Sequence, residues 1–462
     1  MRILLISKET GLYANWFPLS IAYVAAALIK NGYEVEAYCQ DMHHYPDEHL
    51  TEYLDRNHFD VVGVGAIGGY YQYKRLIQIS QAINNSKKRP FLALGGHCVS
   101  PEPEYFLRKT QADVVVIGEA EITIVALVEA IDSGRSLANV KGIAYWNGDK
   151  IIVNEDRELI EDIDSIPLPA YSLFPIEYYR LFRGRLVKKT EFTMPVLTGR
   201  GCSFKCTFCY RMDKSFRQRS AESIIEEIKF LKKNYRINYI YFSDELLMSS
   251  VERTVSLCEA FLKAGLNVSW TCNGRLNYAK PDVLRIMKES GCVFINYGIE
   301  SMDDEVLRNM NKALTTKQII DGVENTLAAG ISPGLNIIFG NIGDNKKVLN
   351  KSVEFLLKYD DGAQLRTIKP VTPYPGSPLY DRAIEKGLIV DCEDFYENKH
   401  VNSDLPTVNF TELDDDEFLR CLYEANSSIL RNYFNKQFHS YDEQAKKLYF
   451  EKDARFRGFR QR

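Results

Sequence analysis

The chain has 462 residues, 45% of them apolar and 26% charged, with a formal net charge of −4 and a pI near 6.1. This length predicts two or three domains, and the near balance of charge gives no long-range attraction for nucleic acid or an anionic membrane. No stretch approaches the roughly 18 apolar residues of a membrane-spanning helix, and the run Met1–Ser7 turns polar too soon for a signal peptide. We therefore expect a cytoplasmic protein with no transmembrane segment and no nucleic-acid partner.

The first 139 residues alternate short aliphatic runs with apolar-periodic segments. The runs predict five strands, at Arg2–Ser7, Val35–Tyr38, Val61–Val64, Phe91–Leu94 and Val114–Ile117. The segments that follow the strands predict helices, at Leu19–Lys30, Glu48–Asn57, Tyr73–Asn84, Glu102–Lys109 and Ile122–Ser133. This alternation predicts a doubly wound parallel sheet, that is, a Rossmann-like α/β domain over residues 1–139.

Small and polar residues gather where three of these strands end. In a parallel sheet, ligands bind at the carboxyl ends of the strands, where small residues let them approach the backbone. No GxGxxG follows the first strand, so a dinucleotide is not expected. Tight turns between strand and helix would also account for the glycines. The candidate ligand residues are Ala66 and Gly68 after the third strand, Gly95, Gly96 and His97 after the fourth, and Gly118, Glu119 and Glu121 after the fifth.

Residues 140–193 have the composition of a linker. Gly142–Val153 is expected to form a hairpin around Asn147-Gly148, a dipeptide that favours two-residue hairpin loops. An acidic, proline-bearing connector follows at Asp162–Ala170.

Residues 194–390 alternate again, and six strand–helix units are counted. Two of the helices are predicted to begin at capping boxes, Ser249-x-x-Glu252 and Thr315-x-x-Gln318. Six units are two short of a closed eight-unit barrel. The sheet should therefore curl into an open (β/α)6 partial TIM barrel, with a lateral mouth that would admit a large substrate.

The remaining residues, 391–462, are expected to form a mostly helical extension. Aromatic and charged residues are mixed along it, and aromatics at helical spacing usually belong to a core. Its basic end, Lys452–Arg462, is expected to be frayed.

Cys202, Cys206 and Cys209 form a CxxxCxxC triplet after the first strand of the barrel. Iron–sulfur clusters with four irons normally take four cysteine thiolates, so a triplet without a fourth partner leaves one iron open to a small molecule. A structural zinc site would need four ligands in CxxC-type pairs, and the chain has no second pair. Three buried thiols are the other alternative. The seven other cysteines are scattered singly and are expected to be buried and reduced: Cys39, Cys98, Cys258, Cys272, Cys292, Cys392 and Cys421.

The triplet resembles the signature of the radical S-adenosylmethionine (SAM) superfamily. This resemblance implies that the three cysteines ligate a 4Fe–4S cluster, that SAM chelates the open iron, and that an electron from a donor such as flavodoxin or ferredoxin cleaves SAM to a 5′-deoxyadenosyl radical. Arg275 would pair with the SAM carboxylate, for which a guanidinium is well shaped, a structural ion pair with Glu300 being the alternative. The implied SAM-binding residues are Phe208, Asp244 and Glu245, Arg275, and Gly298, Glu300 and Ser301.

The runs Leu94–Pro101 and Asp113–Thr123 resemble the cobalamin-binding domain found upstream of many radical SAM enzymes. The resemblance implies cobalamin lying across the strand ends described above. The DxHxxG motif that supplies a histidine to cobalt is absent, so we infer base-off cobalamin without a histidine lower ligand. His97 is then expected to be a polar contact to the corrin, with cobalt ligation as the alternative.

Together these resemblances imply an enzyme that methylates an unactivated carbon or phosphorus centre of a small-molecule, lipid or peptide substrate. Relatives with the same cofactors perform cyclisation, ring contraction or rearrangement, and the sequence does not separate these reactions from methylation. A methylthiotransferase is disfavoured, because such enzymes carry three N-terminal cysteines and the first 150 residues here contain only Cys39 and Cys98. A cobalamin-binding sensor with a vestigial barrel is the non-enzymatic alternative, against which the intact triplet argues.

Overall fold

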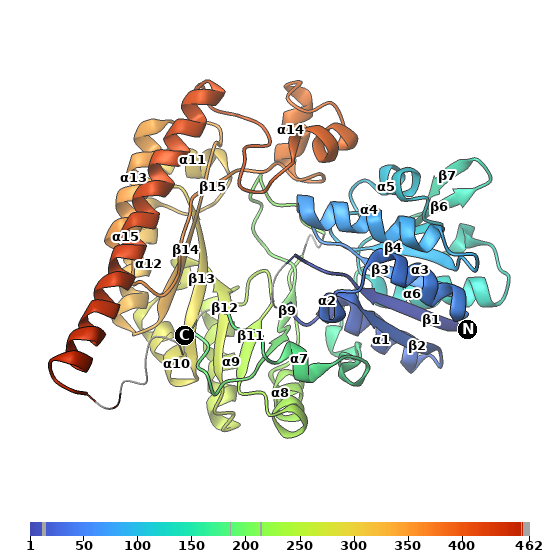
Figure 1. Ribbon diagram of the computed structural model, residues 1–462, viewed down its shortest axis with the longest axis horizontal. Helices are drawn as coiled ribbons and strands as arrows, with labels where there is room; N and C mark the ends of the chain where they lie inside the picture. Colours follow the sequence, from blue (N-terminus) through green and yellow to red (C-terminus); the bar gives the residue numbers. More distant parts are fainter. Residues whose placement is uncertain (12–14, 185, 213–214, 454, 456–462) are drawn as a thin grey trace.

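The computed structural model describes residues 1–11, 15–184, 186–212, 215–453 and 455. Two sheets lie side by side in it, with the N-terminal sheet on the right of Figure 1 and the barrel sheet on the left. The N-terminal sheet has the strand order β2-β1-β3-β4-β5-β6-β7. Its strands are β1 (Arg2–Ser7), β2 (Glu34–Cys39), β3 (Val61–Gly65), β4 (Phe91–Gly95), β5 (Val114–Val116), β6 (Ile143–Asn147) and β7 (Lys150–Val153).

The first five strands are parallel. Strands β1, β3, β4 and β5 are covered on both faces, which is why they are almost continuously apolar, whereas the edge strand β2 exposes Glu34. In β1, Leu4 and Ile6 face one hydrophobic core while Ile3 and Leu5 face the other. Helices α3, α4 and α5 cover the first face, and α1 and α6 cover the second. The predicted doubly wound sheet is confirmed. The helices of this half are α1 (Leu19–Lys30), α2 (Gln40–His43), α3 (Asp47–Arg56), α4 (Tyr70–Asn84), α5 (Pro103–Thr110) and α6 (Ala120–Asp132).

The predicted hairpin is formed by β6 and β7 around Asn147 and Gly148. It is not a free linker element, because β6 pairs antiparallel with β5 and extends the first sheet. The turn η1 (Leu137–Asn139) precedes the hairpin. Three short elements after it lead across to the barrel: η2 (Ile163–Ser165), η3 (Tyr171–Leu173) and α7 (Ile176–Tyr179).

The second sheet is the predicted open arc of six parallel strands, ordered β15-β14-β13-β12-β11-β8. Its two edge strands, β8 and β15, are not paired with each other, so the barrel is incomplete. The strands are β8 (Thr193–Val196), β11 (Tyr239–Phe242), β12 (Ser269–Gly274), β13 (Cys292–Glu300), β14 (Ser332–Phe339) and β15 (Lys369–Pro370). The helical elements around them are α8 (Ala221–Tyr235), α9 (Val251–Lys263), η4 (Leu276–Tyr278), α10 (Pro281–Glu289), α11 (Asp304–Asn309), α12 (Thr316–Ala328) and α13 (Lys346–Lys358).

Two helix starts test the predicted capping boxes. Thr315 and Gln318 form theirs reciprocally at the start of α12. The box at Ser249 and Glu252 is wrong, because the side chain of Ser250 caps α9 by accepting the backbone N–H of Arg253.

A two-stranded ribbon that the periodicity did not predict closes the cysteine loop. Strand β9 (Gly199–Arg200) pairs antiparallel with β10 (Arg217–Gln218), and the loop of residues 201–216 runs between them. Strands of two residues carry too little periodicity to be recognised in a sequence.

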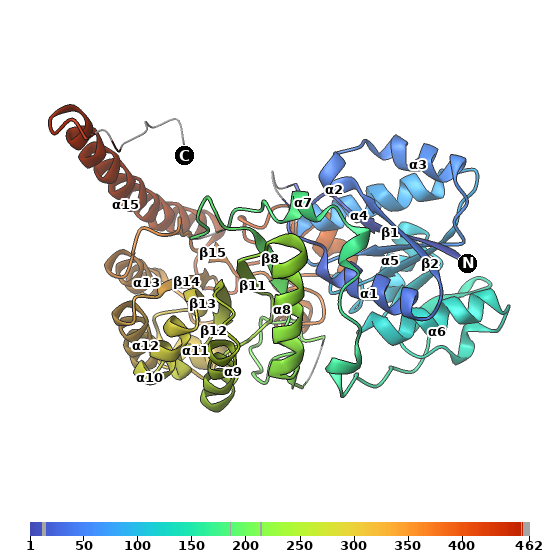
Figure 2. The ribbon, with the colours of Figure 1, turned by 90° about the horizontal axis from the view of Figure 1, so that it is seen from below.

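The C-terminal segment divides between the two halves. Helix α14 (Pro378–Glu385) and the π-helix η5 (Asp394–Lys399) pack into the core of the N-terminal sheet, on the same face as α4 and α5. Helix α15 (Asp415–Tyr449) instead packs along the barrel beside α13, and its far end projects away from the molecule in Figure 2. The packing therefore cuts across the boundary expected at residue 390.

Within the described residues, no helix combines the length and the apolarity needed to cross a membrane. Most of the run predicted to fray, residues 454 and 456–462, lies outside the described part of the chain.

Candidate functional site

The cysteine triplet lies in the loop between β9 and β10. Cys206 is buried, Cys202 is half-buried and Cys209 is exposed. A hydrogen bond from the Cys209 thiol lowers the pKa of Cys206 to about 6 against the opposing effect of burial, with help from the charges of Lys312 and Arg275. No His, Cys, Asp and Glu side chains in the described ranges converge as ligands of a single metal ion. The ligands of a four-iron cluster bind separate irons and need not converge on one point.

Arg275, just after β12, contacts the cysteine loop through Phe204. Its guanidinium carbon lies 3.4 Å from the centre of the Phe204 ring, a cation–π contact. Its Nη2 donates to the backbone carbonyl of Lys312 and, at 2.8 Å, to that of Ala313. The alternative ion pair between Arg275 and Glu300 is therefore not the arrangement found.

Glu300 pairs with Lys312 instead. Lys312 Nζ donates to Glu300 Oε1 at 2.8 Å, and both side chains are less than 10% exposed (8% and 9%). Glu300 ends β13 at a bulge with a left-handed φ of 69°, which turns its carboxylate toward the lysine. A Cβ on Gly298 would lie 2.2 Å from Glu300 Oε1, so a larger residue there would displace the carboxylate from its present position. Phe208 lies beside the pair, with its ring centre 5.6 Å from Lys312 Nζ.

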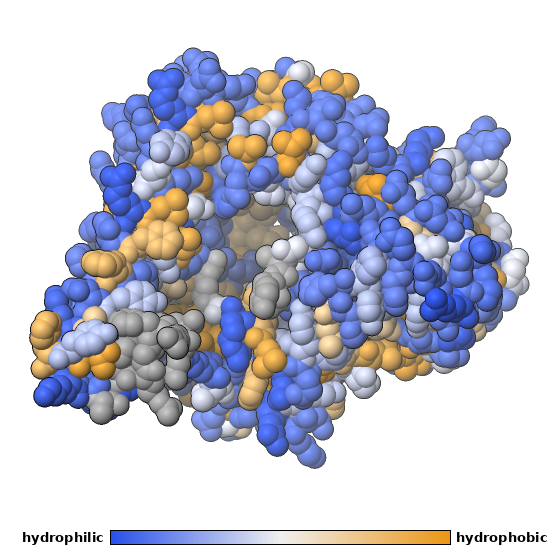
Figure 3. All heavy atoms as spheres, in the orientation of Figure 1, coloured by the Kyte–Doolittle hydropathy of each residue, from blue (hydrophilic) through white to orange (hydrophobic). Residues whose placement is uncertain are grey.

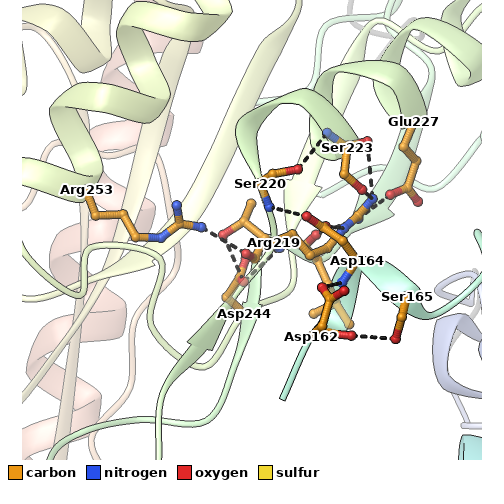
Figure 4. Close-up of polar contacts among 11 residues, drawn as sticks. Asp162, Asp164, Ser165, Arg219, Ser220, Ser223, Glu227, Asp244 and Arg253 are labelled. Atoms are coloured by element: carbon orange, nitrogen blue, oxygen red, sulfur yellow. Dashed lines mark hydrogen bonds and ion pairs between the residues drawn. The ribbon is translucent and has the colours of Figure 1, made fainter. Parts of the chain in front are cut away.

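Three buried polar atoms at the carboxyl edge of the barrel make no hydrogen bond within the described chain: Asp244 Oδ2 after β11, Ser301 Oγ after β13 and Asn341 Nδ2 after β14. Asp244 Oδ1 accepts the backbone N–H and the hydroxyl of Thr198 at 2.8 and 3.0 Å. Arg253 donates to the Thr198 carbonyl from the opposite side (Figure 4). Burial raises the pKa of Asp244 to about 6. Unpaired buried polar atoms cost free energy, so this edge suits a polar ligand.

The strand-end edge of the N-terminal sheet is shaped by its small residues. Gly96 has a φ of 101°, and a Cβ there would lie 2.5 Å from the Ala66 carbonyl oxygen. Gly118 also has a left-handed φ, of 76°. Gly68 is exposed and faces the ring of Tyr374 from the segment after β15. Larger residues at these positions would strain the backbone or narrow the edge.

Glu119 and Glu121 have partners within the protein. Glu119 pairs with Arg200 at 2.7 Å and Arg217 at 2.8 Å, and Glu121 pairs with Arg200 at 2.5 Å. Both carboxylates thus tie the strand-end edge after β5 to the ribbon at the base of the cysteine loop. Their contact with a corrin stays a prediction, since the oxygens already accept hydrogen bonds from arginines.

The two strand-end edges face each other. His97 Nε2, after β4, lies 3.9 Å from Glu245 Oε1, after β11. The His97 ring also meets Tyr210, which directly follows Cys209, edge to face at 5.9 Å between ring centres. Figure 3 shows the surface hollowed where the two halves of the molecule meet. The predicted SAM and corrinoid residues therefore lie on opposite sides of one interface.

Comparison with known proteins agrees with this geometry. The Radical SAM superfamily matches residues 196–356, and the B12 binding domain family matches residues 11–128. An uncharacterised methyltransferase of Pyrococcus horikoshii is 31% identical over 379 residues, which cover 81% of this chain and 80% of that protein. The chain belongs to the B12-binding radical SAM family.

One further relative and one solved structure match most of the length of this radical SAM protein. An anaerobic magnesium-protoporphyrin IX monomethyl ester cyclase of Rubrivivax gelatinosus is 26% identical over 461 residues, 96% of this chain and 79% of that protein. The radical SAM methyltransferase TsrM of Kitasatospora setae, solved with cobalamin and a 4Fe–4S cluster bound, superposes with a TM-score of 0.68 over 83% of this chain and 75% of that one. At 16% identity, this second likeness shows the fold alone.

The donor set of the radical SAM loop fits an iron–sulfur cluster. It offers three soft thiols, one of them with a lowered pKa, and thiolates are the ligands that bind such clusters. The seven other cysteines are all buried elsewhere in the fold, so the loop has no fourth cysteine to offer.

Sequence reasoning missed the residues that position this site from a distance. The sequence alone assigned no role to Lys312. Phe204 and Tyr210 flank the cysteines as ordinary aromatics, and their partners, Arg275 and His97, are visible only in the folded chain.

Changing Glu300 to glutamine should weaken SAM binding while sparing the cluster. The change removes the negative charge that would accept a charge-assisted hydrogen bond from SAM, a bond worth about 1.5–3 kcal/mol, so the Kd for SAM should rise roughly tenfold or more. Equilibrium dialysis of the cluster-loaded protein measures the Kd, and an iron assay measures the cluster. Glu289→Gln, on the surface of α10 and paired with Arg285 of the same helix, is the control and should change neither value. Lost iron in Glu300→Gln would assign the pair a structural role.

Asp344, after β14, should make stability depend on pH. Its Oδ2 accepts the backbone N–H groups of Gly340 and Asn341 at 3.0 and 2.9 Å, and burial raises its pKa to about 7. The folded state then holds this proton more tightly than the unfolded state, so the aspartate stabilises below pH 4 and its contribution is lost as pH rises to 7. The free energy of unfolding of Asp344→Asn, relative to that of wild type, should therefore increase by about 1 kcal/mol or more from pH 5 to pH 8. Paired urea titrations at the two pH values measure this difference. A constant difference would show that Asp344 is ionised throughout this range.

Proposed function

We propose that the protein is a cobalamin-dependent radical SAM methyltransferase acting on an unactivated carbon or phosphorus centre. The observation that carries the proposal is the meeting of the cysteine loop and the glycine-lined strand ends across one interface, through His97, Tyr210 and Glu245. The methyltransferase relative, 31% identical over most of the chain, supports the choice of reaction. When bound, the cluster would cleave SAM to a radical and the corrinoid would supply the methyl group.

The protein's own residues would bind and orient the reactants. Cys202, Cys206 and Cys209 would hold the cluster, and their three thiols would leave one iron for the amino and carboxylate groups of SAM. Lys312 and Glu300 would present one fixed charge of each sign beside Phe208. The unpaired oxygens of Asp244 and Ser301 would accept hydrogen bonds from SAM.

On the opposite side, Gly68, Gly95, Gly96 and Gly118 would let a corrin approach the backbone of the N-terminal sheet. His97 would be a polar contact at the edge of the ring. Such enzymes leave the difficult chemistry to their cofactors, while the protein binds them, orients them and excludes water.

The proposed enzyme would need a one-electron donor, of the flavodoxin or ferredoxin class, and a small-molecule, lipid or peptide substrate. A reducing compartment such as the cytoplasm would suit an oxygen-sensitive cluster and ten free cysteines.

Anaerobic expression with cobalamin tests the proposal. One cluster and one corrinoid per chain, measured by iron, sulfide and corrinoid assays with the ultraviolet–visible spectrum, are expected. A cluster without a corrinoid would overturn the proposal in favour of a cobalamin-independent radical SAM reaction.

Radical cyclisation or rearrangement with the same cofactors is the second candidate. The cyclase of Rubrivivax gelatinosus favours it, because the similarity runs over 96% of this chain. Mass spectrometry of products formed with SAM labelled in its methyl group separates the two, since only methylation transfers the label.

A further inference from the structure

The cysteine loop is fastened to the B12-binding domain at its base. Arg200 and Arg217 lie opposite each other in the β9–β10 ribbon, so they stand where the loop of residues 201–216 begins and ends. Arg200 donates to Glu119 at 2.7 Å and to Glu121 at 2.5 Å, and Arg217 donates to Glu119 at 2.8 Å. Both ends of the loop are thus tied to Glu119, and the first end is also tied to Glu121.

This anchor is buried and reinforced by the backbone. Its four side chains are 6–15% exposed. Glu119 also accepts the N–H of Ile160 at 2.9 Å, and Arg217 also donates to the Ile160 carbonyl at 2.7 Å. Burial alone would raise the pKa of Glu119, but its hydrogen bonds from Arg217, Ile160 and Arg200 hold that pKa below its ordinary value. Charge-assisted bonds of this kind are directional as well as strong.

The carboxylates belong to the edge where the corrinoid is proposed to bind. Glu119 and Glu121 stand at the start of α6, directly after Gly118 and the end of β5. A second tie lies farther along the loop, where Tyr210, next to Cys209, meets His97 after β4. The loop of the cluster ligands and two strand-end loops of the B12-binding domain are therefore joined directly.

We infer that Arg200 and Arg217 are positioning residues that set the place of the cysteine loop over the strand-end edge of the B12-binding domain, acting through Glu119 and Glu121. The inference rests on the proposed function, in which SAM at the loop must meet a corrinoid at that edge. A misplacement of about 1 Å between reacting groups can cost roughly a hundredfold in rate. The anchor therefore sets how much bound SAM transfers its methyl group to the corrinoid, while the cysteines determine whether SAM is cleaved to 5′-deoxyadenosine.

The test compares Arg200→Gln with wild type in the full chain, loaded with cluster and corrinoid. The first measurement is the separation of the reduced cluster from cob(II)alamin, read from the relaxation that the cluster imposes on the cobalt EPR signal. The second is the ratio of S-adenosylhomocysteine to 5′-deoxyadenosine released from SAM under titanium(III) citrate. We expect unchanged iron and corrinoid, a broader range of separations and a ratio lowered about tenfold. Arg200→Lys, which keeps the charge, should recover part of the ratio.

Arg219→Gln is the matched control. Arg219 lies two residues after Arg217, but its buried partner is Glu227 of α8, within the barrel (Figure 4). This control should lower stability without changing the separation or the product ratio. Unchanged values in Arg200→Gln, or equal changes in Arg219→Gln, would overturn the inference.

A wild-type protein that binds no corrinoid would refute the proposed function and leave the anchor open to a separate test. Hydrogen exchange of residues 201–212 in the corrinoid-free full chain then decides. Faster exchange in Arg200→Gln than in Arg219→Gln supports the anchor, and equal exchange overturns it.

Discussion

Replacing Cys202, Cys206 and Cys209 together with alanine should abolish the iron–sulfur cluster and all reductive cleavage of SAM. The loop between β9 and β10 offers no other thiol, because the seven remaining cysteines are buried elsewhere. Corrinoid binding should persist, since the B12-binding domain has hydrophobic cores on both faces of its own sheet. Iron and sulfide assays, the ultraviolet–visible spectrum and chromatography of 5′-deoxyadenosine measure these outcomes.

The matched control for the triple variant is Cys258→Ala. Cys258 is buried in α9 among the core residues of the barrel and lies far from the loop in sequence. It should keep full iron content and full SAM cleavage, with only the modest loss of stability of a small core truncation. Radical chemistry that survived in the triple variant would refute the assignment of the cluster to this loop.

The features that could be predicted from the sequence are those encoded locally. Strands β1, β3, β4 and β5 of the N-terminal sheet are nearly continuous apolar runs because both faces are buried, so their positions follow from composition. The three cysteines fall within eight residues, Cys202–Cys209, so their spacing alone indicates shared ligation. The capping box of α12 was likewise readable, because its two residues are three apart.

The features that could not be predicted depend on how distant segments meet. Glu119 was correctly placed at a strand end, but its partners are 81 and 98 residues away, at Arg200 and Arg217. No local pattern tells whether such a carboxylate faces a ligand or an arginine of another domain. The pairing of Glu300 with Lys312, in preference to Arg275, depends in the same way on a bulge that turns the backbone to a φ of 69°.

The C-terminal segment gives the second large effect that we expect. Phe395, fully buried in η5, packs into the core of the B12-binding domain beside Tyr396, whose ring stacks on Tyr73 of α4 at 4.4 Å. Phe395→Ala should therefore cost about 3–5 kcal/mol of stability, the usual range for a large buried aromatic. Because the lost contacts belong to the N-terminal core, corrinoid affinity should fall while iron content is retained. Urea denaturation, with corrinoid and iron assays on the same preparation, measures both.

Phe434→Ala is the control for this prediction, because it removes the same ring from a surface. Phe434 lies on α15 and is 58% exposed, so its loss should change stability by no more than about 0.5 kcal/mol. Equal effects of the two variants would contradict the packing of η5 on the B12-binding domain. If Phe395→Ala lost iron before it lost corrinoid, η5 would instead be assigned to the core of the barrel. The expected order, corrinoid first, follows because a segment more than 230 residues beyond the B12-binding domain completes that domain's core.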